Sequence, residues 1–572
     1  MKRPLAALVI LAVAGVFRAQ EKPPAKPPEK PPAPAPQAMS PVIENVEVSV
    51  TSIDVIVTDS KGNRVPGLTK DDFQVLQDGI PQNITNFYAV TGGKVLLEDG
   101  QTVSIEEPKT AAMVPQELKA RYIIYIDNLN IQPLNRNRMF KRLKEFVQQT
   151  VGKQAEAMVV VFNRSLKIRK KMTDDPSEIL QVLEEIEGET GGASSQVGDR
   201  KDTLQRLNDA TSPDQAESIA RQYAEAYRND LEFSVDGIRD TVNGLAGMPG
   251  RKVLVYVSEG LPATVGLEMY DVIQRKFQEN ANSLSQFEFD MNSRYASIVQ
   301  AANAQGVTIW ALDASGLQVD DMITAENKTM DVRPSSFIMR TNMQAPLQLM
   351  AEQTGGMAAI NTNDWKSSLD DLASDFSNFY SIGYRSTKAT VDKPHSIEVV
   401  VKRKGLHART RRGLVEKSLE TRTAETVVAN LHYPRIDNPL NISVAMGQAK
   451  PYDRENYLMP VRISIPMSKL GLVPSGDRYE GNFSVYFVVL DAADKQSDLA
   501  VQRQKVEVPA ADFQKAQGKD YYYDVSLICV PGGQKLSVAL RDGVTNVISF
   551  VQKSFFVSVL PPEKKTASNS PS

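Results

Sequence analysis

The stretch RYIIYIDNLNIQ, residues 121–132, decides the fold class of the central part of this chain. Its apolar run YIIYI is continuous rather than alternating, which is typical of a strand buried on both faces of a parallel sheet. The carboxylate of Asp127 follows this run, and α/β sheets keep their ligand sites at the carboxyl ends of their strands. The stretch therefore predicts a buried strand, and it raises the question whether Asp127 binds a metal ion.

The surrounding region, residues 119–387, alternates between strand and helix patterns. The predicted buried strands are AMVVVF (157–162), KVLVYVS (252–258), VTIWAL (307–312), a short strand around Ala358, and YSIGYR (380–385), which ends the region. Apolar residues at helical spacing separate these strands, as in the run from Leu231 to Leu245. We therefore expect a doubly wound, mainly parallel sheet with helices on both faces.

The flanking regions are predicted to be antiparallel β structure. Residues 43–95 and 388–418 contain short alternating runs between turn residues, and neither set is large enough to form a stable sheet alone. We expect them to form one β-sandwich that is interrupted by residues 119–387, with residues 96–118 as a connector. Alternating runs return in residues 419–560 and predict a second sandwich, of the immunoglobulin-like kind.

The ends of the chain indicate an exported protein. Residues 1–19 begin with the basic pair Lys2-Arg3 and continue in a short apolar run, as in a signal peptide, and residues 20–42 form a proline-rich linker. Cleavage after Ala19 fits poorly with Phe17, so an uncleaved anchor stays an alternative. The tail, residues 561–572, has a composition typical of disorder. We expect no transmembrane segment after signal removal, and a periplasmic, cell-surface or extracellular location.

The composition argues against a nucleic-acid partner and against stabilisation by an internal disulfide. The formal net charge of the 572 residues is -3, which argues against a nucleic-acid partner because phosphate binding needs an excess of Lys and Arg. The only cysteine, Cys529, cannot form an internal disulfide, and we expect it to be a buried free thiol.

Residues 188–229 add a polar stretch and a helical pattern to the region between the predicted strands. They indicate either a lid that faces a partner or a tolerated insertion.

These motifs, in this order, resemble a von Willebrand factor type A (VWFA) domain. The matching segments are the strand that ends at Asp127, PGRKVLVYVSEG (249–260), GVTIWALDASGL (306–317), AEQTGG (351–356) and YSIGYR. Together with the upstream VTDSKGNRVPGLTKDDFQVLQDG (57–79), they are similar to exported VWFA-related domain proteins best known from acidobacteria. The resemblance covers roughly residues 45–415, and it implies a Rossmann-like fold and binding to another macromolecule.

The resemblance also implies a possible metal site. Type A domains often hold Mg²⁺ with a DxSxS motif, a Thr and a second Asp. Asp127 matches the first position, but Leu129 and Ile131 replace the two serines, and hydrocarbon cannot supply the oxygen ligands that Mg²⁺ requires. Glu259 replaces the second Asp, and Thr203 is the candidate for the Thr. We expect a degenerate site without a cofactor, in which Asp127 accepts hydrogen bonds within its own loop; Mg²⁺ at Asp127, Glu259 and Thr203 is the alternative.

The other motifs do not point to an enzyme. The segment DAS (313–315) also follows an apolar strand, but its late place in the chain and the turn at Gly316 favour a structural role. The three histidines, His395, His407 and His432, lack metal-ligand spacing, and no GxSxG or cysteine nucleophile motif is present. A carboxylate-based hydrolase would instead require two carboxylates that face each other across a cleft.

We therefore interpret the chain as an exported protein-interaction or adhesion module. Its partner would be a protein or another macromolecule of the cell envelope, and the contact surface would be formed by the loops at the carboxyl edge of the sheet. The residues predicted to line that surface are Asp127, Asn128, Asn130 and Glu259. The alternative is a structural or assembly component of the envelope that acts through its β-sandwiches.

Overall fold

The structure is a computed structural model that describes ten segments of the chain. They are residues 11–12, 51–96, 102–104, 119–152, 155–277, 285–317, 334–386, 391–432, 437–493 and 495–558. The predicted signal peptide, proline-rich linker and tail lie outside these segments, as does most of the connector. The exception is Leu11–Ala12, which forms strand β1.

The chain divides into two compact units. The first unit comprises residues 48–245 and 249–418, and the second comprises residues 1–47, 246–248 and 419–572. Among the residues that the structure describes, no helix combines the length and the hydropathy needed to cross a membrane. The chain is a mixed α/β protein, in which several antiparallel sheets accompany one mainly parallel sheet.

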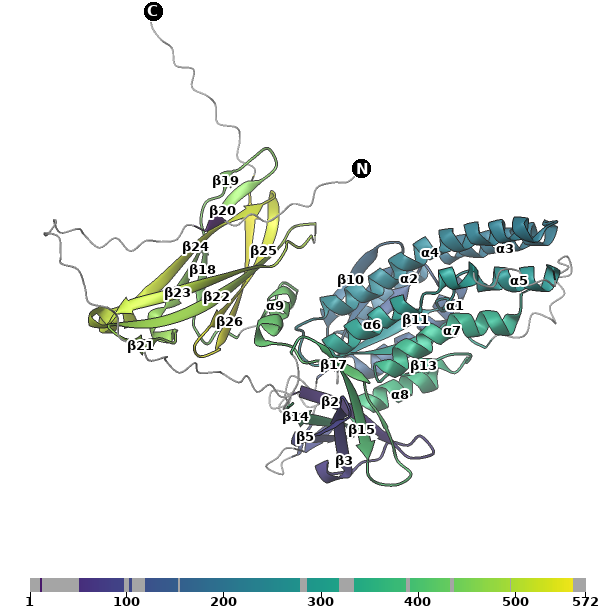
Figure 1. The fold of residues 1–572 in the computed structure, drawn as a ribbon, viewed down its shortest axis with the longest axis horizontal. Helices are drawn as coiled ribbons and strands as arrows, with labels where there is room; N and C mark the ends of the chain where they lie inside the picture. The colour runs from purple at the N-terminus through teal and green to yellow at the C-terminus, as the bar shows by residue number, and fades with distance from the viewer. Residues whose placement is uncertain are drawn as a thin grey trace, which may run out of the picture. The chain divides into compact units, whose positions relative to one another are not determined.

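A six-stranded sheet, of which β10, β11 and β13 are labelled in Figure 1, runs through the first unit in the order β10-β9-β8-β11-β12-β13. Its strands are β8 (Ala120–Asp127), β9 (Ala155–Phe162), β10 (Leu166–Thr173), β11 (Arg251–Ser258), β12 (Val307–Asp313) and β13 (Ala358–Ala359). Neighbouring strands are parallel except β10, which is antiparallel to β9. All residues of β8 are buried, because helices cover both faces of the sheet.

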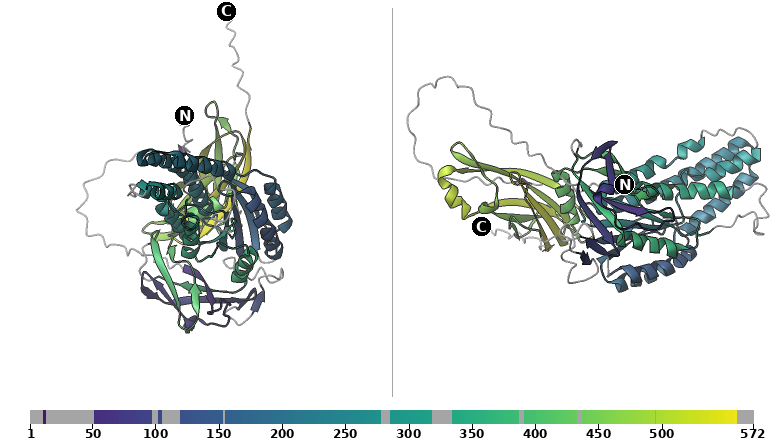
Figure 2. Two further views of the ribbon diagram at one scale, coloured as in Figure 1. Left: turned by 90° about the vertical axis from the view of Figure 1, so that its right-hand side faces the viewer. Right: turned by 90° about the horizontal axis from the view of Figure 1, so that it is seen from below.

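The helices form two layers around this sheet (Figure 2). On one face lie α1 (Pro133–Thr150), α2 (Pro176–Glu187) and α8 (Trp365–Ser377). On the other lie α4 (Pro213–Gly244), α6 (Asn292–Gln305) and α7 (Ser336–Gln353). A Cβ atom on Gly237 of α4 would come within 2.7 Å of Phe162, so glycine permits this close packing. Two further helices, α3 (Ala193–Asp209) and α5 (Leu267–Phe277), lie side by side next to α4 (Figure 1).

Two antiparallel sheets complete the first unit. Their orders are β16-β2-β14-β5-β6-β7 and β17-β15-β3-β4. The strands are β2 (Thr51–Thr58), β3 (Phe73–Gln77), β4 (Ile80–Gln82), β5 (Ile84–Thr91), β6 (Lys94–Leu96), β7 (Thr102–Ser104), β14 (Phe379–Tyr384), β15 (Pro394–Val401), β16 (His407–Arg409) and β17 (Gly413–Val415). Ile53, Val75, Ile382 and Ile397 bring both sheets into one core. The two regions that flank the parallel sheet in sequence therefore build a single β structure.

The position of YSIGYR corrects the sequence interpretation. We expected this run to end the α/β region, but as β14 it lies between β2 and β5 and pairs antiparallel with both. Ile382 is opposite Ile53 on one side and Phe87 on the other. A continuous apolar run has the same appearance in a buried parallel strand and in the central strand of an antiparallel sheet, so periodicity could not distinguish them.

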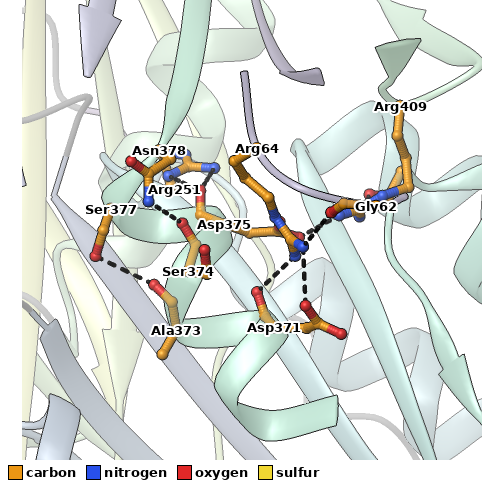
Figure 3. Close-up of polar contacts among 11 residues, drawn as sticks. Gly62, Arg64, Arg251, Asp371, Ala373, Ser374, Asp375, Ser377, Asn378 and Arg409 are labelled. Atoms are coloured by element: carbon orange, nitrogen blue, oxygen red, sulfur yellow. Dashed lines mark hydrogen bonds and ion pairs between the residues drawn. The ribbon is translucent and has the colours of Figure 1, made fainter. Parts of the chain in front are cut away.

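A buried ion-pair cluster joins the antiparallel sheets to α8 within the first unit (Figure 3). The Asp375 carboxylate accepts hydrogen bonds from Nε and Nη2 of Arg64, at 3.0 and 2.8 Å, and also from Arg409. One turn earlier on α8, Asp371 accepts from Nη1 of Arg64 at 2.8 Å. Arg251 pairs with Asp54 at 2.7 Å and stacks over Phe379. The guanidinium groups of Arg64, Arg251 and Arg409, which come from three separate segments, thus lie close to α8.

The second unit contains two antiparallel sheets, as the alternating runs predict. Their orders are β1-β24-β20-β18, with β19 beside β20, and β21-β22-β25-β26, with β23 beside β22. The strands are β18 (Ser443–Met446), β19 (Lys450–Pro451), β20 (Tyr457–Pro466), β21 (Val473–Ser475), β22 (Arg478–Leu490), β23 (Ala500–Pro509), β24 (Asp520–Cys529), β25 (Gly532–Asp542) and β26 (Ile548–Val557). Ile463, Leu527, Phe487 and Val538 bring the sheets into one core, which also contains Cys529.

The start of this unit differs from the all-β expectation. Residues Leu419–Ala429 form helix α9, and a shorter helix, α10, spans Phe513–Gln517. Val427 of α9 packs with Tyr486 and Val488 of β22 in a second apolar cluster. The helix therefore covers the side of β22 that faces away from the main core, which explains why β22 is apolar on both sides.

Candidate functional site

A cavity of about 340 Å³ lies at the carboxyl edge of the parallel sheet. Its wall contains residues that follow β8, β11 and β12, together with residues of α3, α4, α5 and α7. The ends of β11 and β12 are adjacent because Ser258 and Asp313 are partners in the strand register. The backbone amide of Glu259 donates to the carbonyl of Asn130 at 3.0 Å, which fixes the loop after β11 against the loop after β8.

Asp127 is fully buried. The sequence-based prediction that it lines the contact surface is therefore wrong. Its Oδ2 accepts hydrogen bonds from the Tyr256 hydroxyl at 2.5 Å and from Nδ2 of Asn130 at 2.9 Å. Its Oδ1 accepts from the backbone amide of Asn130 at 3.3 Å, as the expectation of an internally bonded aspartate requires. Burial raises the pKa of the Asp127 carboxyl, although these hydrogen bonds oppose the increase.

The residues at the serine positions do not fit a Mg²⁺ ion. Leu129 and Ile131 are both buried, and Ile131 belongs to the apolar core beneath α1. Their side chains offer no oxygen ligand, and the Asp127 carboxylate is already occupied by three donors. Among the described segments, no group of three or more His, Cys, Asp or Glu side chains is arranged to hold a metal ion.

The two asparagines of the loop have different positions. Asn128 is fully buried, and its Oδ1 accepts from Nη1 of Arg136 at 2.6 Å, so the prediction that it lines the surface is wrong. Asn130 is also mostly buried, but it reaches the cavity wall while Nδ2 donates to Asp127 and to Ser234. Asn128 therefore stabilises the loop, whereas Asn130 connects the buried carboxylate to the cavity.

Thr203 does not join this group. It lies on α3, where its hydroxyl donates to the carbonyl of Asp199 at 2.7 Å, and it is not part of the cavity wall. The polar stretch that contains Thr203 is nevertheless important, because Gln196, Val197 and Arg200 of α3 form one side of the cavity. The segment expected to be a lid or an insertion thus contributes to the site through neighbouring residues.

Two carboxylates, Glu259 and Asp313, line the cavity together. Oε1 of Glu259 accepts from the backbone amide of Gln132 at 2.9 Å and from Nδ2 of Asn135 at 2.8 Å. Burial raises the pKa of the Glu259 carboxyl, and the charge of Asp313 adds to the increase. Glu259 is the predicted residue that the structure places most clearly at the site.

Asp313 stabilises the turn after β12 and also lines the cavity. Oδ1 accepts from the amide and the hydroxyl of Ser315, at 2.9 and 2.5 Å, as expected for a turn. Oδ2 accepts from Nε2 of Gln344 of α7 at 2.8 Å. Burial raises the pKa of the Asp313 carboxyl. Sequence reasoning missed its place in the cavity because only the parallel register brings the ends of β11 and β12 together.

The helical side of the cavity contains further charged groups. Arg200 of α3 lies 3.7 Å from Glu268 of α5, which also accepts from the Tyr223 hydroxyl at 3.5 Å. Arg340 of α7 lines the cavity as well. Within the part of the chain that the structure describes, Arg340 has no ion-pair partner. The cavity is therefore polar and contains charges of both signs.

Four large exposed apolar side chains either line this cavity or lie within two residues in sequence of a residue that does, and we call them the apolar rim. They are Leu134 (82% exposed), Val197 (47%), Leu317 (56%) and Phe337 (65%). Val197 lines the cavity, whereas Leu317 and Phe337 are close in sequence to the lining residues Ser315 and Ser336. Leu134 precedes Asn135, which donates to Glu259. Exposed apolar side chains in combination with a polar cavity are typical of a protein-binding surface.

Comparisons with known proteins do not identify a family. No family model and no curated protein matches the chain. A solved aerotolerance-related membrane protein from Bacteroides fragilis is similar at 11% identity over 45% of this chain and 98% of that chain, with a TM-score of 0.25. The conserved hypothetical protein BatB from Bacteroides thetaiotaomicron is similar at 8% identity over 45% and 98%, with a TM-score of 0.21.

A third solved structure contains three N-terminal domains of the type V pili tip protein Mfa5 from Porphyromonas gingivalis. It is 9% identical, the alignment covers 92% of this chain and 79% of that chain, and the TM-score is 0.24. TM-scores of this size carry no argument about a shared fold or a shared function. The functional interpretation therefore rests on the geometry of the site.

Proposed function

We propose that the chain is an exported protein-interaction or adhesion module, built on a VWFA-like, Rossmann-like domain with a degenerate metal site. The contact is made by the cavity at the carboxyl edge and by its apolar rim. The observation that carries the proposal is a charged cavity whose wall includes the exposed Val197 and whose lining residues have exposed apolar neighbours in sequence, namely Leu134, Leu317 and Phe337. Such a surface combines an apolar area that gains from burial with polar groups that provide specificity.

The partner is proposed to be a protein of the cell envelope, consistent with the export signal predicted from the sequence. The proposed location is the periplasm, the cell surface or the extracellular space. The fold is compatible with a binding function but does not determine it, because one fold hosts many functions. The chemistry of the site distinguishes between them. No nucleic acid is proposed as partner, since the net charge of the chain is -3.

Two substitutions of equally exposed phenylalanines test the proposal. Phe337 of the apolar rim is 65% exposed, and Phe556 of β26 in the second unit is 68% exposed. The full-length chain and its Phe337→Asp and Phe556→Asp variants are used to capture cross-linked partners from envelope extracts. We expect Phe337→Asp to abolish the capture of a partner that Phe556→Asp still binds. A partner that both variants retain would contradict the proposal.

The alternative function is a structural or assembly role through the antiparallel sheets. Exposed aromatic residues of the second unit, such as Tyr522 and Phe556, favour it as a second candidate. It predicts the opposite result, with capture lost in Phe556→Asp and retained in Phe337→Asp. Deletion of residues 420–560 gives an independent comparison, because only the structural role requires the second unit for binding.

We propose no enzymatic activity, although one observation requires a direct test. Glu259 and Asp313 share a cavity, which is the arrangement that a carboxylate-based hydrolase would need. Hydrolysis of a panel of chromogenic glycosides and peptide anilides is measured for the chain and its Glu259→Gln variant. We expect no turnover above the buffer rate in either protein. Turnover that disappears in Glu259→Gln would replace the binding function by a catalytic one.

A further inference from the structure

The charges in the cavity are not balanced internally. Glu268 has Arg200 at 3.7 Å, so this carboxylate is already paired. Glu259 and Asp313 accept hydrogen bonds only from uncharged donors, namely backbone amides, a serine hydroxyl and side-chain amides. Within the described segments, neither carboxylate has an ion-pair partner. Two carboxyl groups at neighbouring strand ends therefore lack a cationic partner in these segments.

The positive side chain that acts on Glu259, Arg138, does not form an ion pair with either carboxylate. The guanidinium of Arg138 lowers the pKa of Glu259 through its charge, but it donates to the carbonyl of Ser315 at 3.3 Å and stacks on Trp365 instead of contacting the carboxylates. A cation placed between Glu259 and Asp313 would be attracted by both groups in a partly buried environment, where screening by water is weaker than at the surface.

The apolar rim indicates what form this cation takes. Val197 lines the cavity itself, and Phe337 follows the lining residue Ser336. A free metal ion gains nothing from such side chains. A lysine or arginine side chain does, because its aliphatic stem packs on apolar groups while its charged end reaches the carboxylates.

The opposite occupant, an acidic side chain, fits less well. Of the two arginines that line the cavity, Arg200 already has Glu268 as a partner and only Arg340 is unpaired in the described segments, whereas Glu259 and Asp313 are both unpaired there. Like charges brought together at an interface are unfavourable and act against the wrong partner. The balance of two unpaired carboxylates against one unpaired guanidinium therefore favours a basic residue.

We infer that the partner inserts a lysine or arginine side chain, flanked by apolar residues, into the cavity at the carboxyl edge, where Glu259 and Asp313 hold its charged group. This inference rests on the proposed function and adds the chemistry of the contact. Recognition then needs no metal ion, because the partner supplies the positive charge that a bound cation would otherwise provide.

The test uses three synthetic peptides that differ only at the central residue, which is lysine, norleucine or glutamate, between leucine and phenylalanine on both sides. Each peptide carries a fluorescent label, and its binding is measured by fluorescence anisotropy as the full-length chain is added in excess over the peptide. We expect the lysine peptide to bind about tenfold more tightly than the norleucine peptide, which corresponds to about 1.4 kcal/mol. The glutamate peptide should bind most weakly.

Two variants locate this preference. Glu259→Gln keeps an oxygen acceptor for Gln132 and Asn135 but removes the charge, and it should reduce the lysine preference to less than twofold. Glu184→Gln, on the exposed side of α2, is the matched control and should retain the preference. Retention of the preference in Glu259→Gln would overturn the inference.

The outcomes separate the inference from the proposed function. Equal binding of all three peptides, with loss of binding in Phe337→Asp, would overturn the basic contact and leave the interaction surface intact. Absence of binding for every peptide at millimolar concentration would also overturn the inference, while the capture experiment with Phe337→Asp and Phe556→Asp would still decide the proposed function.

Discussion

Replacement of Asp375 by alanine should strongly destabilise the first unit, because this carboxylate holds two arginines from the antiparallel sheets. Its side chain is 5% exposed, and it accepts two hydrogen bonds from Arg64 and one from Arg409. Removal of one partner from a buried ion pair typically costs about 3–5 kcal/mol. Both arginines keep another acceptor, which is Asp371 for Arg64 and the Gly355 carbonyl for Arg409. We therefore expect about 3 kcal/mol, the lower end of this range.

Asp371 provides a matched control on the same helix. It contacts the same Arg64, but its side chain is 37% exposed and it forms a single ion pair. Exposed pairs contribute at most about 1 kcal/mol, so Asp371→Ala should have a small effect on the free energy of unfolding. The difference between the two alanine variants reports burial together with the additional pair to Arg409, since the residue type, the helix and Arg64 are shared.

Urea unfolding followed by tryptophan fluorescence measures both variants in the full-length chain. The chain has 2 tryptophans, Trp310 in β12 and Trp365 in α8, and both belong to the first unit. Their emission therefore reports the unfolding of this unit separately from the second unit, which avoids fitting one transition to a protein with two units. If Asp375→Ala costs no more free energy than Asp371→Ala, the reasoning about the buried cluster is wrong.

Three further predictions concern the thiol, the buried aspartate and the metal. Burial raises the pKa of the Cys529 thiol to about 12, so we expect no reaction with a disulfide reagent at pH 8 in the folded chain and complete reaction in urea; rapid labelling of folded protein would contradict the buried position. Burial also raises the pKa of Asp127 above its ordinary 3.8, so the folded state binds this proton more tightly than the unfolded state does. Its stabilising contribution is complete below that pH and is lost as the pH rises through the folded-state pKa, and the free energy of unfolding of the wild type relative to Asp127→Asn should therefore fall between pH 4 and pH 8. A constant difference in urea unfolding across this range would show that Asp127 does not change its pKa on folding. Calorimetric titration with Mg²⁺ or Mn²⁺ should give no binding heat, because Leu129 and Ile131 supply no oxygen ligand; saturable heat that disappears in Asp127→Asn would restore the metal site.

The site shows the limit of sequence reasoning most clearly. Glu259 could be predicted from the resemblance to a VWFA domain, and it directly follows the buried strand β11. Asp127 and Asn128 follow such a strand as well, but they are buried under their own loop, with hydrogen bonds from Tyr256 and Arg136. Those partners come from distant segments and from the next helix, so no local pattern shows whether a polar side chain points to solvent or into the protein.

The sequence by itself determined the local structure of the chain. The continuous run YIIYI and its counterparts specify strands buried on both faces, and helical periodicity specifies the segments between them, because each element must bury its apolar side chains. Only the tertiary structure decided which strands became neighbours. The run YSIGYR joined β2 and β5 rather than the parallel sheet, and the register of β11 and β12 brought Glu259 beside Asp313. Strand pairing depends on contacts between residues far apart in sequence, and apolar strands satisfy the same local rules in either sheet.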